Sequence, residues 1–315
     1  MSTIVIVPPE LPRDWLERLD QAQADCEVIV GIDSTPAERL PKVEGLLSLL
    51  TTSVDSALLD RLPKLRVVSN MAVGYDNVDL QACAARKIAV GHTPGVLTDA
   101  TADLTMALLL AAARRIDESA RDAREGRWQT WTPDGWLGVE LRGTTLGIIG
   151  LGKIGYAVAE RARAFGMRIV YASRSEHAEA EQLDATRLSL DSLLANSDFI
   201  SVHVPLSADT VWMIDAAALA KVKRGAILIN TARGQVVDQH ALIAALHDGR
   251  LRAAALDVTT PEPLPPDHPL YSTPGCLIVP HIGSATETTR RRMAELACMN
   301  LLAGIRGEPL PHQIG

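Results

Sequence analysis

Three glycines spaced as G-x-G-x-x-G constrain the fold of this chain more than any other feature. They are Gly150, Gly152 and Gly155, and they lie between the apolar run from Thr144 to Ile149 and a helical pattern. In a strand-turn-helix unit, the first glycine permits the tight turn and the second lets a pyrophosphate approach the backbone. The third allows the helix to pack closely on the strand. This context predicts a dinucleotide-binding turn, and a purely structural turn is the alternative.

We expect every residue of this turn to contact the dinucleotide. The predicted cofactor-binding residues here are Gly150, Leu151, Gly152, Lys153, Ile154 and Gly155. The N-terminus of the helix that follows has N–H groups and the positive end of the helix dipole, and both favour a phosphate.

Length and composition indicate a globular protein of two domains. The chain has 315 residues, of which 47% are apolar, and a net charge of -7, which argues against a nucleic-acid surface. The apolar segment from Ala102 to Ala113 is shorter than the ~20 residues of a membrane span. The segment from Met1 to Pro8 lacks the basic start of a signal peptide. We therefore expect a cytoplasmic protein with neither a nucleic-acid nor a membrane partner.

The cysteines indicate neither a disulfide framework nor a metal site. Cys26, Cys83, Cys276 and Cys298 are widely scattered, without C-x-x-C spacing or a clustered histidine. We expect reduced, mostly buried thiols and no bound metal.

Apolar runs alternate with helical patterns along the whole chain, which predicts parallel sheets covered by helices. The expected strands of the first series are Thr3 to Val7, Cys26 to Gly31, Gly45 to Leu50 and Arg66 to Asn70. Those of the second begin at Thr144 and continue near Met167 to Ala172, Asp198 to Val204, Ala226 to Asn230, Ala253 to Val258 and Cys276 to Val279. The fold class is thus α/β, with two doubly wound parallel-sheet domains.

A long helix from Thr98 to about Arg124 is expected to connect the two series, and the final helix, Ala285 to Arg306, to return to the first. This order predicts a Rossmann NAD(P)-binding domain at residues 99–284, inserted in a flavodoxin-like substrate-binding domain at 1–98 and 285–315. We expect the active site in the cleft between them.

Three of the five tryptophans, Trp128, Trp131 and Trp136, cluster in a segment without strand or helix periodicity. Aromatic residues gathered in a loop are typical of a surface that another subunit covers, so residues 114–143 are a predicted dimerisation loop. The alternative is packing beneath the chain's own loop.

Polar residues follow three strands of the second series, at the edge where open α/β sheets bind ligands. They include Arg233, Glu262 and His281. A guanidinium can hold a carboxylate in two parallel hydrogen bonds, and a histidine beside a carboxylate has a fixed tautomer and can donate a proton. Together they meet the needs of 2-oxo-acid reduction. Taken singly, each has a simpler interpretation: a surface charge, a half-buried histidine or a rigid turn between prolines.

The chain resembles the D-isomer-specific 2-hydroxyacid dehydrogenases, and within them the glyoxylate/hydroxypyruvate reductases. The segments that carry the resemblance are Asn230 to Asp238, Leu256 to Pro263, Pro280 to Ala285, Met71 to Asn77 and His92 to Thr98. Related phosphoglycerate dehydrogenases carry an arginine near Asn70, and phosphite dehydrogenases carry a lysine at Val73, so both of these activities are excluded.

The resemblance implies a role for several residues. Arg233 would bind substrate, Glu262 and His281 would form the acid/base pair, and the backbone N–H groups of Val73 and Gly74 would receive the substrate carboxylate. Asp257 would orient the nicotinamide carboxamide, with Thr231 and His281 also contacting the cofactor. Trp131 would reach the active site of the neighbouring subunit in a homodimer.

The end of the strand from Arg168 to Ala172 predicts the preferred cofactor. NAD sites place an acidic residue here to bind the ribose 2′-OH, whereas this chain has Ser173, Arg174 and Ser175. Arg174 can pair with a 2′-phosphate and the two hydroxyls can donate to it, so we expect NADP(H) to be preferred, with NAD(H) possible. The alternative is an exposed arginine that tolerates either cofactor.

Two other functions stay open at this point. One is reduction of 2-ketogluconate or another longer 2-oxo acid, which needs a roomier cleft. The other is a dinucleotide-sensing transcriptional corepressor, because such relatives can retain Arg233, Glu262 and His281.

Overall fold

The structure, a computed structural model, describes residues 3–314 and divides into two compact units. Unit 1 comprises the residues up to Leu97 together with those from Ala285 onward, and unit 2 runs from Thr98 to Ser284. No helix within residues 3–314 combines the length and the apolarity that crossing a bilayer requires.

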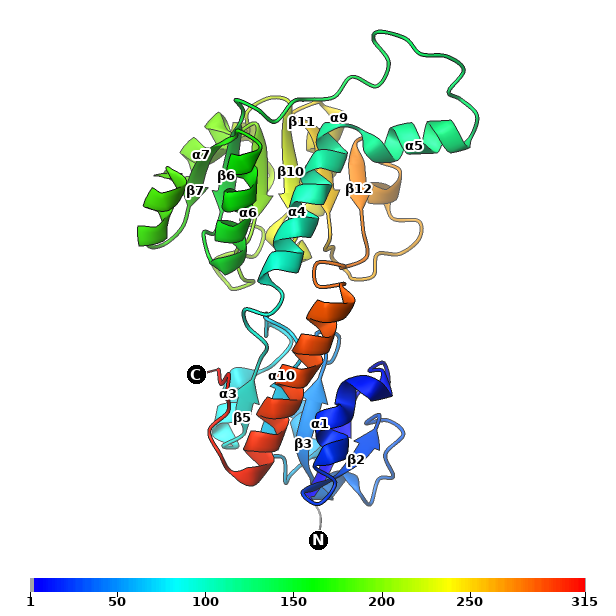
Figure 1. The fold of residues 1–315 in the computed structure, drawn as a ribbon, viewed down its shortest axis with the longest axis vertical. Helices are drawn as coiled ribbons and strands as arrows, with labels where there is room; N and C mark the ends of the chain where they lie inside the picture. Colours follow the sequence, from blue (N-terminus) through cyan, green and yellow to red (C-terminus); the bar gives the residue numbers. More distant parts are fainter. Residues whose placement is uncertain (1–2, 315) are drawn as a thin grey trace. The chain divides into compact units, whose positions relative to one another are not determined.

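Unit 1 is built on a parallel five-stranded sheet with the order β2-β1-β3-β4-β5 (Figure 1). Its strands are β1 (Thr3–Val7), β2 (Cys26–Val30), β3 (Val43–Ser48), β4 (Val67–Asn70) and β5 (Ala89–Gly91). Its helices are α1 (Glu17–Gln21), α2 (Ser56–Arg61), α3 (Leu80–Ala85) and α10 (Glu287–Arg306). As expected, the C-terminal helix α10 packs on this first sheet, where Ser69 of β4 donates a hydrogen bond to the carbonyl of Ala297.

Unit 2 is built on a parallel seven-stranded sheet with the order β12-β11-β10-β9-β6-β7-β8. Its strands are β6 (Thr145–Ile149), β7 (Arg168–Ala172), β8 (Thr186–Arg187), β9 (Phe199–Val202), β10 (Ala226–Asn230), β11 (Leu251–Leu256) and β12 (Cys276–Ile278). The chain winds outward from β6 in one direction and from β9 in the other. A ligand site is therefore expected beyond the carboxyl ends of these two central strands.

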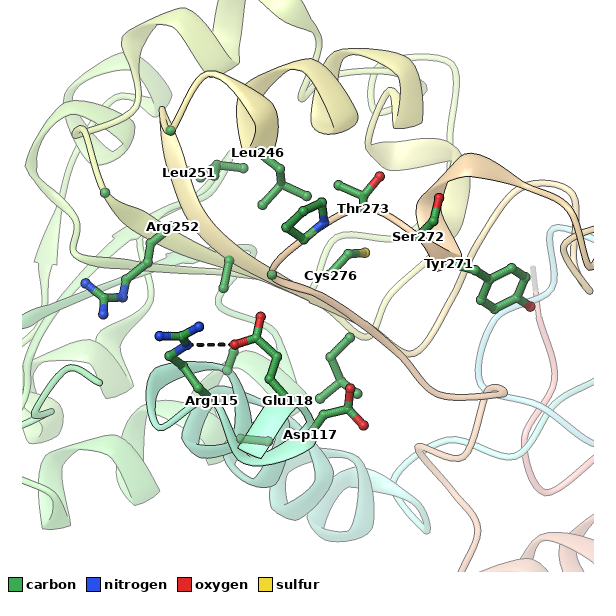
Figure 2. A pocket seen from close by; sticks show the side chains of 18 of the residues that line it. Arg115, Asp117, Glu118, Leu246, Leu251, Arg252, Tyr271, Ser272, Thr273 and Cys276 are labelled. Atoms are coloured by element: carbon green, nitrogen blue, oxygen red, sulfur yellow. Dashed lines mark hydrogen bonds and ion pairs between the residues drawn. The ribbon is translucent and has the colours of Figure 1, made fainter. Parts of the chain in front are cut away.

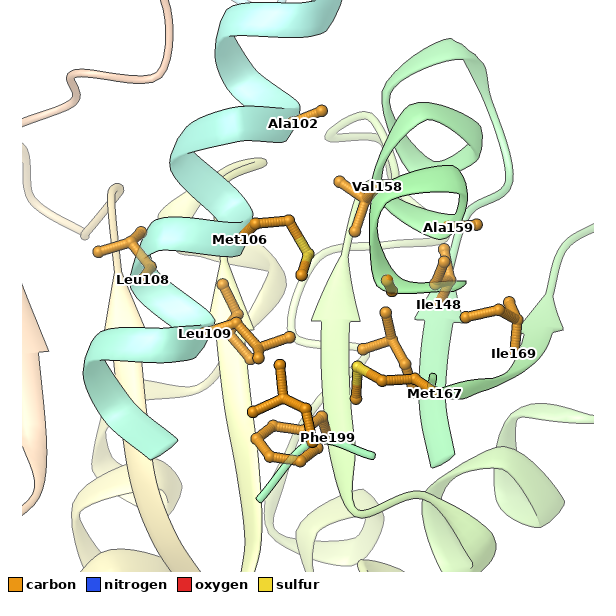
Figure 3. Packing of buried hydrophobic residues seen from close by; sticks show 14 of the residues in the cluster. Ala102, Met106, Leu108, Leu109, Ile148, Val158, Ala159, Met167, Ile169 and Phe199 are labelled. Atoms are coloured by element: carbon orange, nitrogen blue, oxygen red, sulfur yellow. The ribbon is translucent and has the colours of Figure 1, made fainter. Parts of the chain in front are cut away.

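Helices cover both faces of this second sheet. They are α4 (Thr98–Ala113), α6 (Lys153–Ala164), α7 (Leu190–Asn196), α8 (Ala216–Lys221) and α9 (Gln239–His247), whereas α5 (Ile116–Arg124) has no buried residue. On one face, Met106 and Leu109 of α4 and Val158 of α6 pack over Ile148 and Phe199 of the strands (Figure 3). Apolar side chains of α7, α8 and α9 cover the other face. With both faces buried, the strands are almost continuously apolar.

Short 3-10 helices complete the two units. They span Arg13–Leu16, Leu40–Lys42, Ala178–Leu183, Gly234–Val236 and Pro269–Tyr271.

The prediction of a single helix from Thr98 to Arg124 is wrong, because the structure has two helices there. Arg115 adopts a left-handed conformation (φ 54°), which ends the helical hydrogen-bond ladder and turns the chain into α5. The carbonyl of Ala113, at the end of α4, instead accepts a hydrogen bond of 2.8 Å from the N–H of Val139. The chain that follows α5 thus returns to cap α4.

Candidate active site

The turn between β6 and α6 has the geometry that a pyrophosphate needs. Gly150 is left-handed (φ 95°), and a Cβ on Gly155 would lie 2.2 Å from the carbonyl oxygen of Gly150. A Cβ on Gly152 would meet no atom within 4 Å, so this backbone faces open space, and α6 begins without a side-chain cap. These features fit a dinucleotide phosphate at the helix N-terminus.

The other residues of the turn differ in exposure. Lys153 is exposed and Ile154 is half-buried, whereas the side chain of Leu151 packs in the core of unit 2. Any contact that Leu151 makes with a cofactor is therefore through its backbone.

The segment after β7 forms a turn of Ser173, Arg174 and Ser175, of which Ser173 is half-buried and the other two are exposed. The hydroxyl of Ser173 donates to the carbonyl of Ser175, which closes the turn on itself. None of these three side chains is acidic, and Arg174 is exposed. The turn thus presents a guanidinium to the solvent at the end of the second strand of the Rossmann unit.

The structure brings His281 and Glu262 together beyond the carboxyl ends of β11 and β12. Nδ1 of His281 lies 2.5 Å from Oε1 of Glu262, and the N–H of Thr259 points to Oε2 of Glu262 at 3.4 Å. Since the carboxylate engages Nδ1, exchange of a proton with a substrate falls to Nε2 of His281.

The surroundings of Glu262 favour the charged form of its carboxyl group. Burial opposes its ionisation, but the hydrogen bond and the charge of His281, the N–H of Thr259 and the positive charge of Arg233 together lower its pKa.

Arg233 follows β10 in a loop that is held by Asn230. The side-chain amide of Asn230 donates to the carbonyl of Arg233 at 2.9 Å, and its oxygen accepts the N–H of Ala232 at 3.0 Å. Nη1 of Arg233 donates to the carbonyl of Ala232. A Cβ on Gly234 would lie 2.1 Å from the carbonyl of Thr259, so this loop and the Glu262 loop are in close contact.

Asp257 holds the backbone of the segment that carries His281. Its Oδ1 accepts the N–H of Ile282 at 2.6 Å, its Oδ2 accepts that of Gly283 at 2.8 Å, and its carbonyl accepts that of His281 at 2.9 Å. His281 is left-handed (φ 50°), a conformation that costs free energy for a non-glycine residue and that these bonds stabilise. Burial raises the pKa of Asp257 against these hydrogen bonds.

Thr231 is buried beside these loops. Its hydroxyl lies 3.0 Å from that of Thr105 on α4, which in turn donates to the carbonyl of Thr101. These bonds link the end of β10 to the helix that covers it.

Val73 and Gly74 lie in unit 1, after β4. Nδ1 of His92 lies 3.0 Å from the carbonyl of Val73, and the carbonyl of Ala72 accepts the N–H of Thr93 at 2.9 Å. These bonds hold the peptide groups that carry the N–H of Gly74 and the N–H of Val73, as the binding of a carboxylate by backbone N–H groups requires.

The predicted dimerisation loop carries exposed tryptophans. Within the single chain, Trp128 is 68% and Trp131 is 78% exposed, while Trp136 contacts the guanidinium of Arg115, whose Cζ lies 4.8 Å from its ring centre. Packing of Trp128 and Trp131 beneath the chain's own loop, the alternative interpretation, is therefore wrong.

A pocket of about 830 Å³ lies at the amino ends of β11 and β12, opposite the carboxyl ends that lead to Glu262 and His281 (Figure 2). Arg115, which precedes α5, and Glu118 of α5 line it together with Arg252, Tyr271 and Cys276. Its walls lack the residues expected to carry the chemistry, so it is not the candidate active site. Across residues 3–314, no group of three or more His, Cys, Asp or Glu is placed to hold a metal ion.

Sequence reasoning missed three residues that shape the site. They are Asn230, Gln239 and His203. Gln239 bonds both the N–H and the carbonyl of Thr260, and the carbonyl of His203 lies against Gly150.

His203 as a whole is half-buried, but burial of its imidazole lowers the pKa of that ring to about 3. Nε2 of His203 lies 2.7 Å from the hydroxyl of Ser201. Two of these residues could have been found from their positions in the sequence, since Asn230 ends an expected strand and His203 lies at the end of another.

Comparisons with known proteins agree with this geometry. Residues 106–283 match the family described as D-isomer specific 2-hydroxyacid dehydrogenase, NAD binding domain. A glyoxylate reductase from Aeropyrum pernix is 48% identical over 319 residues, which cover 98% of this chain and 95% of the relative.

Solved structures have the same fold over nearly the full length. A protein from Thermus thermophilus superposes with a TM-score of 0.91 at 48% identity, covering 99% of this chain and 100% of the other. An NADPH-dependent glyoxylate/hydroxypyruvate reductase from Sinorhizobium meliloti, in complex with NADP and malonate, gives a TM-score of 0.89 at 33% identity. That match covers 100% of this chain and 97% of the other.

Proposed function

We propose, from the premise that this chain belongs to the D-isomer-specific 2-hydroxyacid dehydrogenase family, that it reduces small 2-oxo acids such as glyoxylate and hydroxypyruvate. The observation that carries the proposal is the 2.5 Å hydrogen bond between His281 and Glu262, with the loop that carries Arg233 in close contact with the Glu262 loop. Relatives named for reduction of these substrates support the choice of small acids.

In this proposal, the residues of unit 2 bind and protonate the substrate. Arg233 holds the substrate carboxylate, which its planar guanidinium can grip in two parallel hydrogen bonds. Nε2 of His281 donates a proton to the carbonyl oxygen as negative charge develops there. The Glu262 carboxylate stabilises the protonated imidazole and fixes its tautomer. A bound nicotinamide cofactor supplies the hydride to the carbonyl carbon.

The glycine turn and the turn after β7 are proposed to bind that cofactor, with NADPH preferred over NADH. The support is the absence of a carboxylate among Ser173, Arg174 and Ser175, together with a guanidinium that can pair with a 2′-phosphate. Thr231 and Asp257 complete the proposed cofactor contacts, Asp257 toward the carboxamide. We propose that the reaction needs no metal.

The N–H groups of Val73 and Gly74 are proposed to receive the substrate carboxylate. The hydrogen bonds that hold these two peptide groups support this role.

We also propose a homodimer, formed through the segment at 114–143. Trp128 and Trp131 are apolar surfaces that a partner subunit would bury, and Trp131 would contact the substrate of that partner. A cytoplasmic location is consistent with the cysteines, all four of which are free thiols.

A substrate panel with both cofactors tests the proposed function. Purified protein is given glyoxylate, hydroxypyruvate or 2-ketogluconate with NADPH or NADH, and cofactor oxidation is followed by absorbance. The expected result is the highest kcat/KM with one of the two small acids and NADPH. A higher kcat/KM for 2-ketogluconate would reassign the substrate, and cofactor binding without turnover of any acid would favour a dinucleotide sensor.

A further inference from the structure

Strand β8 places an arginine beside the turn that is proposed to select the cofactor. This strand has only two residues, and Arg187 pairs with Tyr171, one residue before the end of β7. Parallel pairing at this register brings the side chain of Arg187 next to Ser173 and Arg174.

The guanidinium of Arg187 is bonded to the backbone of this turn. Its Nη2 donates to the carbonyl oxygen of Ser173 at 2.9 Å and to that of Arg174 at 3.0 Å, and its Nε lies 3.3 Å from the same oxygen of Ser173. The third carbonyl, that of Ser175, accepts the hydroxyl of Ser173. All three carbonyl oxygens of the turn thus have a donor within the protein.

The same guanidinium pairs with the carboxylate that follows the turn. Nη1 of Arg187 lies 3.5 Å from Oε1 of Glu176, whose side chain is 85% exposed. A carboxylate at the end of this strand is the group that accepts the ribose 2′-OH in sites that prefer NADH. Left unpaired, Glu176 would also repel a 2′-phosphate, which carries a charge near -2.

We propose that Arg187 is a specificity-determining residue for NADPH, because it neutralises Glu176 and the turn carbonyls so that Arg174 and the hydroxyl of Ser175 meet the 2′-phosphate. This inference rests on the NADPH preference proposed above. It assigns the preference to a residue on the neighbouring strand, outside the turn itself. Arg187 acts on the phosphate through its own positive charge and through its bonds to the turn carbonyls and to Glu176.

Binding of two fragments of the cofactor tests this role without turnover. Isothermal titration gives the affinities for adenosine 2′,5′-bisphosphate and for adenosine 5′-phosphate, which differ only in the 2′-phosphate. The wild-type protein is expected to bind the bisphosphate more tightly. Arg187→Leu should reduce that ratio by about tenfold or more, since it removes a positive charge near the phosphate and leaves the carboxylate of Glu176 unpaired.

Three further variants separate the possible causes. Arg187→Lys keeps the charge without the planar fork and should retain part of the ratio. Adding Glu176→Gln to Arg187→Leu should recover part of the lost ratio, because the unshielded carboxylate is gone. Arg163→Leu is the matched control, since Arg163 also donates to a backbone carbonyl, that of Gln182, and it should leave the ratio unchanged.

The outcomes distinguish this inference from the proposal beneath it. Equal binding of both fragments by the wild-type protein would refute the NADPH preference itself. A wild-type ratio that survives in Arg187→Leu would overturn the role of Arg187 alone, and a double variant no better than the single one would overturn the shielding of Glu176. If circular dichroism shows that Arg187→Leu is unfolded, Arg187→Lys decides: an unchanged ratio contradicts the need for the fork.

Discussion

Nδ1 of His281 and Oε1 of Glu262 lie 2.5 Å apart, although the two residues are separated by 19 positions and two loops. The pair is preorganised from both sides. Asp257 holds the backbone that follows His281, and Gln239 bonds both the N–H and the carbonyl of Thr260 in the loop that carries Glu262. A proton donor that is already oriented needs little rearrangement when substrate arrives.

Glu262→Gln should move the pH profile of the reduction. The pKa of Glu262 is lowered, so its carboxylate is charged at neutral pH and favours the protonated imidazole. An amide removes that charge, so the pH optimum of kcat/KM should shift toward acid by roughly one pH unit or more. The measurement is kcat/KM against pH, with the exposed Glu308→Gln as control. An unmoved pH optimum would contradict the pairing.

Arg233→Lys should lower kcat/KM far more than the conserved positive charge suggests. Lysine cannot form two parallel hydrogen bonds with a carboxylate, so kcat/KM for glyoxylate should fall by roughly 10- to 100-fold. Arg224→Lys is the matched control, because Arg224 precedes β10 at its opposite end and is exposed. Unchanged KM and kcat in Arg233→Lys would mean that Arg233 does not touch the substrate.

Arg174→Ala should weaken NADPH more than NADH. Loss of a guanidinium facing the 2′-phosphate is expected to raise KM for NADPH by about tenfold, while KM for NADH changes much less. The two values are measured at saturating glyoxylate, alongside Arg163→Ala. Equal weakening of both cofactors, or a parent enzyme that prefers NADH, would show that this turn does not select the cofactor.

Trp131→Ala should weaken a dimer and alter substrate choice. A tryptophan that is 78% exposed in the single chain is a candidate interface anchor, and such residues contribute about 2 kcal/mol or more when truncated. Light scattering over a concentration series measures the dissociation constant, with the exposed Trp212→Ala as control. A wild-type protein that is monomeric at all concentrations would refute both effects.

Most strands could be predicted from the sequence, because apolar runs between turn residues persist in a sheet buried on both faces. The predictions missed β5 and β8, whose three and two residues are too short to show a pattern. The helix ending at Ala113 was predicted too long, since its end depends on the left-handed Arg115 and on the distant N–H of Val139. Neither of these leaves a local signal.

The candidate site, too, could be predicted only in part from the sequence. Arg233, Glu262 and His281 could be proposed because each follows a strand, and parallel strands end at one edge of the sheet. The hydrogen bonds of Asn230 and Gln239 could not, because they depend on loop conformations that only the folded chain defines. Arg187 was missed for a related reason, since it lies on an unpredicted strand.

The most direct test of the central claim is glyoxylate-dependent oxidation of NADPH by the wild-type protein and by His281→Ala, measured side by side. If His281 donates the proton, the wild type turns over glyoxylate, and the variant loses kcat and kcat/KM together by about 10² to 10⁴. Near-normal turnover by His281→Ala, or no glyoxylate-dependent oxidation by the wild type with either cofactor, would contradict the account.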